Sequence, residues 1–105
     1  MPEHVDNQQT IFQAACALAP VGMEIAAVAA REPERRAIVS EHGNRSFSEL
    51  NQRANQLARL MREAGLKAGD PVALLCSNRP EFVEVVMAAH RLGLRLTPVN
   101  WHLKA

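Results

Sequence analysis

The segment covering residues 72–99 constrains the fold most, because its pattern predicts a strand, a helix and a strand with short joints. Val72–Cys76 is a continuous apolar run between turn residues, which is typical of a strand buried on both faces. A largely apolar helix is expected over Arg79–Leu92, and a second strand over Leu94–Val99. Strands joined in this way lie parallel, with a right-handed crossover. The sequence therefore predicts a parallel βαβ unit.

The start of that helix allows two interpretations. In the first, Asn78 caps the helix, Pro80 occupies the first turn, where no amide partner is lost, and Glu81 completes a capping box. In the second, Ser77, Asn78 and the first helix amides hold an anion, because they follow the carboxyl end of a strand, where α/β proteins place ligands. Capping is favoured, since it accounts for both polar residues.

A second helix is predicted over Phe47–Ala64. Ser46 and Glu49 have the spacing of a capping box, and Glu49 and Arg53 stand four residues apart in the favourable order for an ion pair. Gly65 is placed to end the helix in the left-handed conformation, and residues 67–70 predict a turn. This helix with its preceding strand is expected to lie beside the βαβ unit.

The remaining elements are expected around this pair of units. Residues 1–9 are polar and expected to be frayed. The turn signal Glu41-His42-Gly43-Asn44, with Gly43 and Asn44 suited to positive φ, predicts a small hairpin. The further expected elements are the helices Thr10–Leu18 and Val21–Arg31 and the strands Ala37–Ser40 and Arg45–Phe47. Together they predict a three-layer α/β fragment, with residues 1–25 as a partly helical extension and residues 26–105 as an incomplete domain.

The chain's 105 residues are enough for one domain at most. A net charge of +1, from 12 Lys and Arg against 11 Asp and Glu, gives no field to steer nucleic acid or an acidic membrane surface. Five basic residues gather around one helix, but only 4% of residues are aromatic, so a solvated helix face is favoured over a nucleic-acid site. These residues are Arg45, Arg53, Arg59, Arg62 and Lys67.

The two cysteines favour a reducing, cytoplasmic location. Cys16 and Cys76 both lie in apolar runs and are expected to be buried free thiols. The Ala-rich stretch Ala14–Ala30 is interrupted by Pro20 and Glu24, so neither a signal peptide nor a membrane-spanning helix is expected.

The sequence contains no motif that assigns a catalytic, cofactor-binding or metal-binding residue. All five glycines are isolated, so no phosphate-binding loop is present. The histidines and cysteines lack ligand spacing, and no carboxylate pair has general-acid spacing. The residue types that could ligate a metal are His4, His42, His90, His102, Cys16 and Cys76. Trp101 is expected to anchor a loop onto a larger core.

Two strings carry a resemblance to a known family: REPERRAIV, and the stretch from RSFSEL through GLKAGDPVALLCSNRPEF to GLRLTPVNWHL. They resemble the N-terminal region of the adenylate-forming acyl-CoA synthetases, the AMP-binding superfamily, over residues 26–103. TPVNWHL is most similar to the fatty-acyl and medium-chain acyl-CoA ligases. The positions in register are Gly65, Gly69, Asp70, Val72, Asn78, Glu81, Gly93, Pro98 and Asn100.

The resemblance implies a parent enzyme several times longer. Such enzymes use ATP and Mg to convert a fatty or other carboxylic acid to an acyl-adenylate, and then pass the acyl group to CoA. The motifs for that chemistry would lie beyond Ala105, so the chain by itself is expected to bind no cofactor and to be inactive. The alternative is a shortened paralogue that acts as an interaction module, pairing through its sheet edge with itself or with a full-length synthetase.

Overall fold

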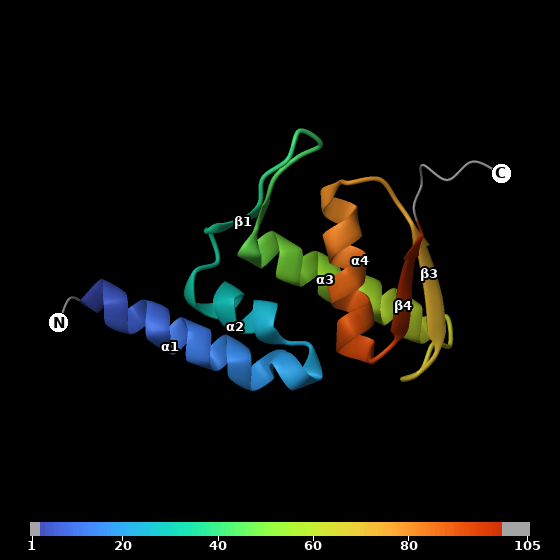
Figure 1. Ribbon diagram of the computed structural model, residues 1–105, viewed down its shortest axis with the longest axis horizontal. Helices are drawn as coiled ribbons and strands as arrows, with labels where there is room; N and C mark the ends of the chain where they lie inside the picture. Colours follow the sequence, from blue (N-terminus) through green and yellow to red (C-terminus); the bar gives the residue numbers. More distant parts are fainter. Residues whose placement is uncertain (1–2, 100–105) are drawn as a thin grey trace.

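The computed structural model describes residues 3–99, and within them the side chains of residues 10–20 and 22–99. The described strands form two separate two-stranded sheets, β1–β2 antiparallel and β3–β4 parallel (Figure 1). The predicted α/β organisation, with a small hairpin and a parallel unit, is confirmed. In chain order the elements are α1 (Glu3–Leu18), the 3₁₀ turn η1 (Ala19–Val21), α2 (Glu24–Arg31), β1 (Arg36–Ile38), β2 (Arg45–Ser46), α3 (Phe47–Glu63), β3 (Pro71–Leu75), α4 (Pro80–Leu92) and β4 (Arg95–Val99).

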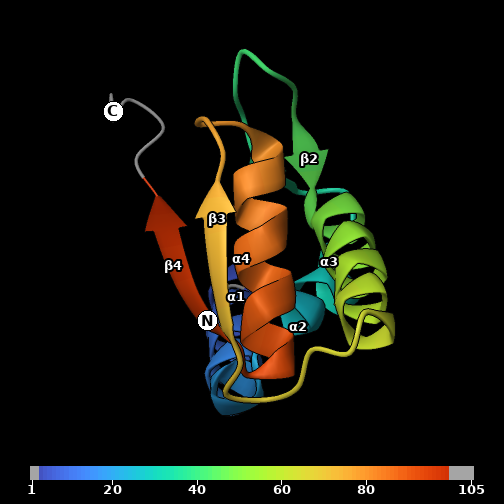
Figure 2. The same ribbon diagram turned by 90° about the vertical axis from the view of Figure 1, so that its right-hand side faces the viewer.

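The β3–α4–β4 unit forms one end of the molecule. Its strands pair in register from Pro71 opposite Arg95 to Leu75 opposite Val99, and α4 lies against one face of them (Figure 2). Gly93, at φ 71°, ends α4 in the left-handed conformation that glycine adopts without steric cost. The chain can therefore turn at once into β4, as the short joints predicted.

The outer face of this sheet is uncovered within the described residues. Leu75 is 69% exposed, and Ala73 on the same face is exposed together with its β4 partner Thr97. The expectation that residues 72–76 form a strand buried on both faces is therefore wrong for the described part of the chain. An apolar run shows that both faces tolerate burial, but covering the second face requires another layer of structure.

The capping box of α3 is confirmed. Ser46 Oγ accepts a hydrogen bond from the Glu49 amide at 3.1 Å, and Glu49 Oε1 accepts one from the Ser46 amide at 2.9 Å. The bond that the Ser46 backbone amide donates to the carboxylate, followed by the Ser46 side chain, lowers the pKa of the Glu49 carboxyl. At the other end Gly65 adopts φ 96° and ends the helix. Both boundaries of α3 thus follow from local side-chain chemistry.

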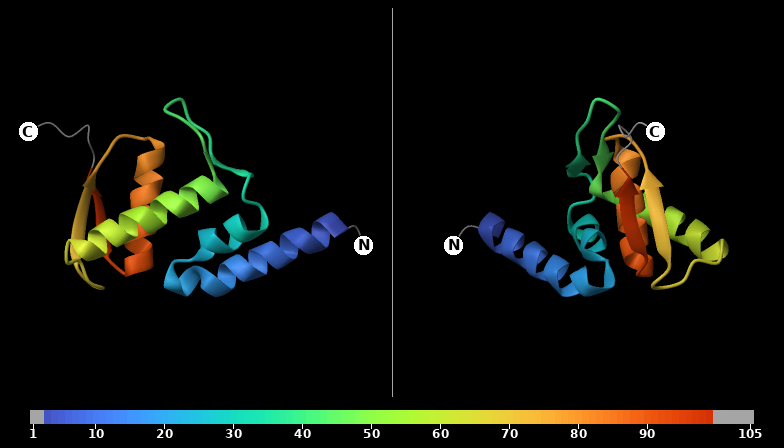
Figure 3. Two further views of the ribbon diagram at one scale, coloured as in Figure 1. Left: turned by 180° about the vertical axis from the view of Figure 1, so that it is seen from behind. Right: turned by 45° about the vertical axis from the view of Figure 1, so that its right-hand side comes forward.

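The core lies where α2, α3 and α4 meet, and it consists mainly of alanines. Figure 3 shows α3 crossing α4 obliquely, with α2 beside them. Small side chains at these contacts allow the helix backbones to approach closely. The buried apolar residues are Ala27, Ala29, Leu50, Ala54, Ala58, Ala88 and Ala89.

The N-terminal helices differ from their expected bounds. The first begins at Glu3 rather than Thr10, because no glycine or proline interrupts residues 3–18 despite their polar start. The second begins at Glu24 rather than Val21, because the chain first forms the η1 turn and then passes through Gly22 at φ 73°. A Cβ atom at Gly22 would lie 2.8 Å from the carbonyl carbon and oxygen of His90, so this turn packs directly onto α4.

The hairpin is also shorter than predicted. Strand β1 ends at Ile38 rather than Ser40, and the second arm ends at Ser46 because Phe47 begins α3. Gly43 has φ 123°, but among the described residues no residue other than glycine has positive φ, so the expectation for Asn44 is wrong. Asn44 instead closes the turn with its side chain, whose Oδ1 accepts from the Ser40 amide at 3.1 Å.

Candidate functional site

Helix α4, which follows the carboxyl end of β3, has a different N-cap residue from the one predicted. The N-cap residue is Arg79, which is extended at φ −141° and ψ 166° and makes no side-chain capping bond. The expected cap at Asn78 with a capping box from Glu81 is therefore wrong, whereas Pro80 in the first turn is confirmed. The reason is local: a residue before proline avoids the helical region, which places the cap one residue later than expected.

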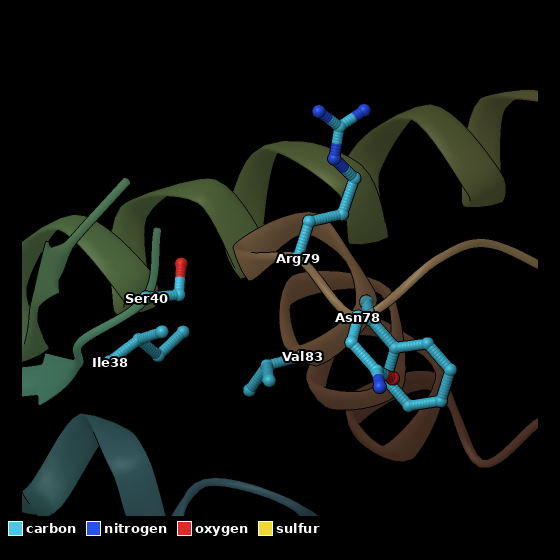
Figure 4. A pocket seen from close by; sticks show the side chains of 6 residues that line it. Ile38, Ser40, Asn78, Arg79 and Val83 are labelled. Carbon is cyan, nitrogen blue, oxygen red and sulfur yellow. The ribbon is translucent and has the colours of Figure 1, made fainter. Parts of the chain in front are cut away.

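A cavity of about 210 Å³ lies between the hairpin and the start of α4. In Figure 4, Ile38 and Ser40 line the cavity from the hairpin, and Val83 of α4 lies opposite them. Asn78 and Arg79 line it at the beginning of the helix. Arg79 pairs with Glu81 at 3.8 Å and turns its guanidinium away from Val83 in this view. The sixth lining residue is Phe82. The walls are mainly apolar, so this arrangement suits a small apolar group better than proton transfer.

Beside the cavity lies a cluster of charges that sequence reasoning missed. Glu84 is only 3% exposed, and its Oε1 accepts a hydrogen bond from Arg45 Nε at 2.9 Å and lies 3.6 Å from Arg53 Nε. Arg45 also approaches Glu81 at 3.6 Å. This carboxylate holds Arg45, whose side chain is only 14% exposed, whereas the Arg53 side chain is 50% exposed and so fits the predicted solvated helix face. The sequence does contain one sign of this cluster: Glu84 is a charged residue among the apolar positions of the helix, and a buried charge needs a partner.

The half-buried Arg91 joins three segments. The Arg91 guanidinium donates to Asn51 Oδ1 and Asn55 Oδ1, both at 2.7 Å, to the Asn51 carbonyl at 3.2 Å and to the Gly22 carbonyl at 3.3 Å. Burial lowers the pKa of Arg91, and the Glu24 carboxylate opposes that shift. This arginine fastens the η1 turn and α3 to α4.

Glu24 also contacts His90, whose Nδ1 lies 3.4 Å from Glu24 Oε1. Its other oxygen, Oε2, is buried and has no hydrogen-bond partner among the described residues. Since the His90 side chain is 47% exposed, solvent screens the pair, and its contribution to stability is small. Glu24 thus acts mainly by its charge, beside the Arg91 guanidinium.

The other candidate residues are dispersed. Among the described residues, no group of three or more His, Cys, Asp or Glu is placed to hold a metal ion. Both cysteines are free, as predicted, but Cys16 is exposed and Cys76 is half-buried, so the expectation of buried thiols is wrong. The His4 side chain, Trp101 and His102 lie outside the described residues. No helix in the described range is long and apolar enough to cross a membrane.

Three basic residues of the predicted patch, Arg59, Arg62 and Lys67, are exposed. They fit the interpretation of a solvated helix face. The four-residue spacing of Glu49 and Arg53 leads to a different pairing from the one expected: Glu49 bonds to Ser46, and Arg53 approaches Glu84 on α4. The Ser46 bonds are the main cause of the lowered Glu49 pKa, but the Arg53 charge lowers it as well, so the local interaction persists beside the tertiary contact.

Sequence comparison decides the family. Residues 25–105 match the profile of AMP-binding enzymes. The chain belongs to the AMP-binding enzyme family. The predicted resemblance to the N-terminal region of adenylate-forming enzymes is thereby confirmed, and the parallel β3–α4–β4 unit and the small hairpin are the parts of that region described above.

Individual relatives agree with this placement. The chain is 41% identical over 73 residues to tyrocidine synthase 2 of Brevibacillus parabrevis, covering 70% of the chain and 2% of that protein. It is 41% identical over 71 residues to 2-succinylbenzoate–CoA ligase of Geobacillus kaustophilus, covering 68% of the chain and 14% of the ligase. The Mycobacterium tuberculosis fatty acyl CoA synthetase superposes with a TM-score of 0.74 at 30% identity, covering 82% of the chain and 18% of the synthetase. The chain therefore spans a small part of the length of these relatives.

Proposed function

We propose that this chain is the N-terminal part of an ATP-dependent acid–CoA ligase that forms AMP. In the proposed reaction a fatty or other carboxylic acid attacks the α-phosphate of Mg-ATP, pyrophosphate leaves, and the acyl-adenylate then transfers its acyl group to the CoA thiol with release of AMP. The observation that carries this proposal is the family match over residues 25–105. Support for the acyl class comes from the similarity to a fatty acyl CoA synthetase and a 2-succinylbenzoate–CoA ligase.

Within that enzyme the described residues serve as scaffold. Residues 1–25 form an extension ahead of an incomplete domain, and no residue of the chain is assigned to catalysis, a cofactor or a metal. Adenylate formation needs groups that hold three phosphates and neutralise the charge that develops on them. The cavity beside α4 has mainly apolar walls, and its arginine is paired with Glu81. The 105-residue chain alone is therefore expected to be inactive. The two free cysteines favour a reducing cytoplasm as the place where the enzyme works.

The direct test has two parts. The first is ATP–pyrophosphate exchange by the purified 105-residue chain with a panel of carboxylic acids, using a complete acid–CoA ligase as positive control. Exchange at the level of the control would refute the scaffold role. The second is an immunoblot of source cells with an antibody against residues 47–69. A band several times heavier than 11.6 kDa supports an enzyme made as a longer chain, and a single band at 11.6 kDa contradicts it.

One observation favours a second candidate, a non-catalytic interaction module. The outer face of the β3–β4 sheet presents exposed side chains, with Leu75 at 69% and Val99 at 37% exposure. A sheet with an open face and open edges can pair with a second copy or with a full-length synthetase. Light scattering after size-exclusion chromatography distinguishes the candidates, since a stable oligomer of the 105-residue chain supports the module and a monomer at all concentrations contradicts self-association.

A further inference from the structure

Glu84 is a buried carboxylate to which the proposed function gives no role. It lies on the side of α4 that faces the hairpin and α3, and it is 3% exposed. A buried charge is costly unless it is paired and hydrogen-bonded, and here the partner at bonding distance is Arg45 of β2, at 2.9 Å. The position of the hairpin is therefore coupled to the pairing of Glu84.

The tip of the hairpin is braced by its own bonds. The Ser40 amide donates to Asn44 Oδ1 at 3.1 Å, the Ser40 hydroxyl donates to the Gly43 carbonyl at 2.6 Å, and the Gly43 amide donates to the Ser40 carbonyl at 3.2 Å. Arg45 Nη1 also donates to the Asn44 carbonyl at 2.9 Å. These bonds brace the tip internally, and none of them reaches α4, so they do not fix the position of the tip relative to that helix.

The base of the hairpin is anchored, whereas its arms are weakly held. The Phe47 amide donates to the Arg35 carbonyl at 2.9 Å, which ties the base to the start of α3. Beyond the base, the β1–β2 ladder has two partner pairs with an irregular register between them, and Val39 is 69% exposed. The hairpin projects from the body of the molecule (Figure 1, green loop), and the cavity of about 210 Å³ separates its inner side from α4.

We propose that residues 36–46 form a hinged flap over this cavity, and that Glu84, through Arg45, is the latch that holds the flap against α4. Apolar packing across the gap is incomplete because the cavity occupies it, so the charge pair supplies the main restraint on the flap. Glu81 is a matched comparison one turn earlier in α4: it lies 3.6 Å from the same arginine, but its side chain is 48% exposed. Solvent screens such a pair, so Glu81 contributes little to the latch.

The test is amide hydrogen exchange of the 105-residue chain, comparing Glu84→Gln with the control Glu81→Gln. Glu84→Gln keeps the shape of the side chain and removes the charge. The proposal expects exchange in residues 36–46 to accelerate about tenfold or more, because a buried pair has lost one partner. Glu81→Gln should change it by less than about threefold. Exchange in residues 71–75 of β3 should stay as in the wild type for both variants.

Arg45→Lys is the second variant, in case Glu84→Gln does not fold. Lysine keeps the positive charge beside Glu84 but loses the planar guanidinium that also reaches Asn44 and Glu81. The proposal expects a smaller acceleration that is again confined to residues 36–46. Two results would overturn it: hairpin exchange that is unchanged in the folded variants, or exchange in β3 that accelerates in step with the hairpin, which would make Glu84 a general stabilising residue.

Discussion

Gly22 offers the sharpest test of how the N-terminal turn packs on α4. A Cβ atom at this position would lie 2.8 Å from the His90 carbonyl carbon and oxygen and 2.9 Å from the Arg91 amide nitrogen. These are backbone atoms of a helix, which cannot move aside as a flexible side chain can. In Gly22→Ala, we expect about 1–2 kcal/mol from placing alanine at positive φ and about 1–3 kcal/mol from overpacking, a loss of roughly 2–5 kcal/mol in all.

Gly65→Ala is the matched control. Gly65 has φ 96°, and a Cβ there would meet nothing within 4 Å. Because 73° is nearer than 96° to the left-handed minimum, backbone strain alone would make Gly22→Ala the milder change. Urea unfolding followed by circular dichroism measures both variants. If Gly22→Ala loses no more stability than Gly65→Ala, the turn does not pack against α4 as described, and the reasoning is refuted.

Three further predictions concern the cap of α3, the half-buried Arg91 and the open sheet face. Because the Glu49 pKa is lowered, its contribution to stability is present above the unfolded pKa of about 4.3 and is lost as pH falls through the folded pKa. Urea titrations should therefore show a larger loss of stability for Glu49→Gln near pH 7 than near pH 3. An equal loss at both pH values would contradict the capping box. Arg91→Lys should lower the free energy of unfolding by about 1–3 kcal/mol, because lysine cannot reproduce the guanidinium's bonds to the Asn51 and Asn55 side chains. An unchanged free energy of unfolding would show that these bonds add no stability. Leu75→Glu, on the open face of the β3–β4 sheet, should change the free energy of unfolding by less than about 0.5 kcal/mol, whereas Leu50→Ala, at a residue 2% exposed, should lower it by about 2–5 kcal/mol. Similar losses for both variants in thermal melting would mean that the outer face of the sheet is covered.

Local signals in the sequence predicted most of the elements that have chemical punctuation. The Ser46 and Glu49 pair, Gly65 and Gly93 predicted where helices begin or end, and each is confirmed, because a cap satisfies free backbone groups with atoms a few residues away. The apolar run after residue 71 and the short joint at Gly93 likewise predicted the parallel pairing of β3 with β4. These inferences need no knowledge of distant residues.

Two of the errors arose where local signals competed. At the start of α4, Pro80 made Arg79 the N-cap and so displaced Asn78. At the N-terminus, the polarity of residues 1–9 suggested fraying, but residues 3–9 contain no glycine or proline, and α1 begins at Glu3. In both places the steric constraint on the backbone decided the outcome, and the composition of the segment did not.

The sequence by itself determined the element types, the parallel unit and the family of this protein, since these depend on spacing along the chain. Only the tertiary structure decided that Arg45 donates to Glu84 and that Arg91 donates to Asn51 and Asn55, over separations of 36 to 40 residues. It also decided that the outer face of β3 is open in the described residues. Ion pairing and burial depend on which surfaces meet in space, and a pattern of residues along one element carries no record of the surface opposite it.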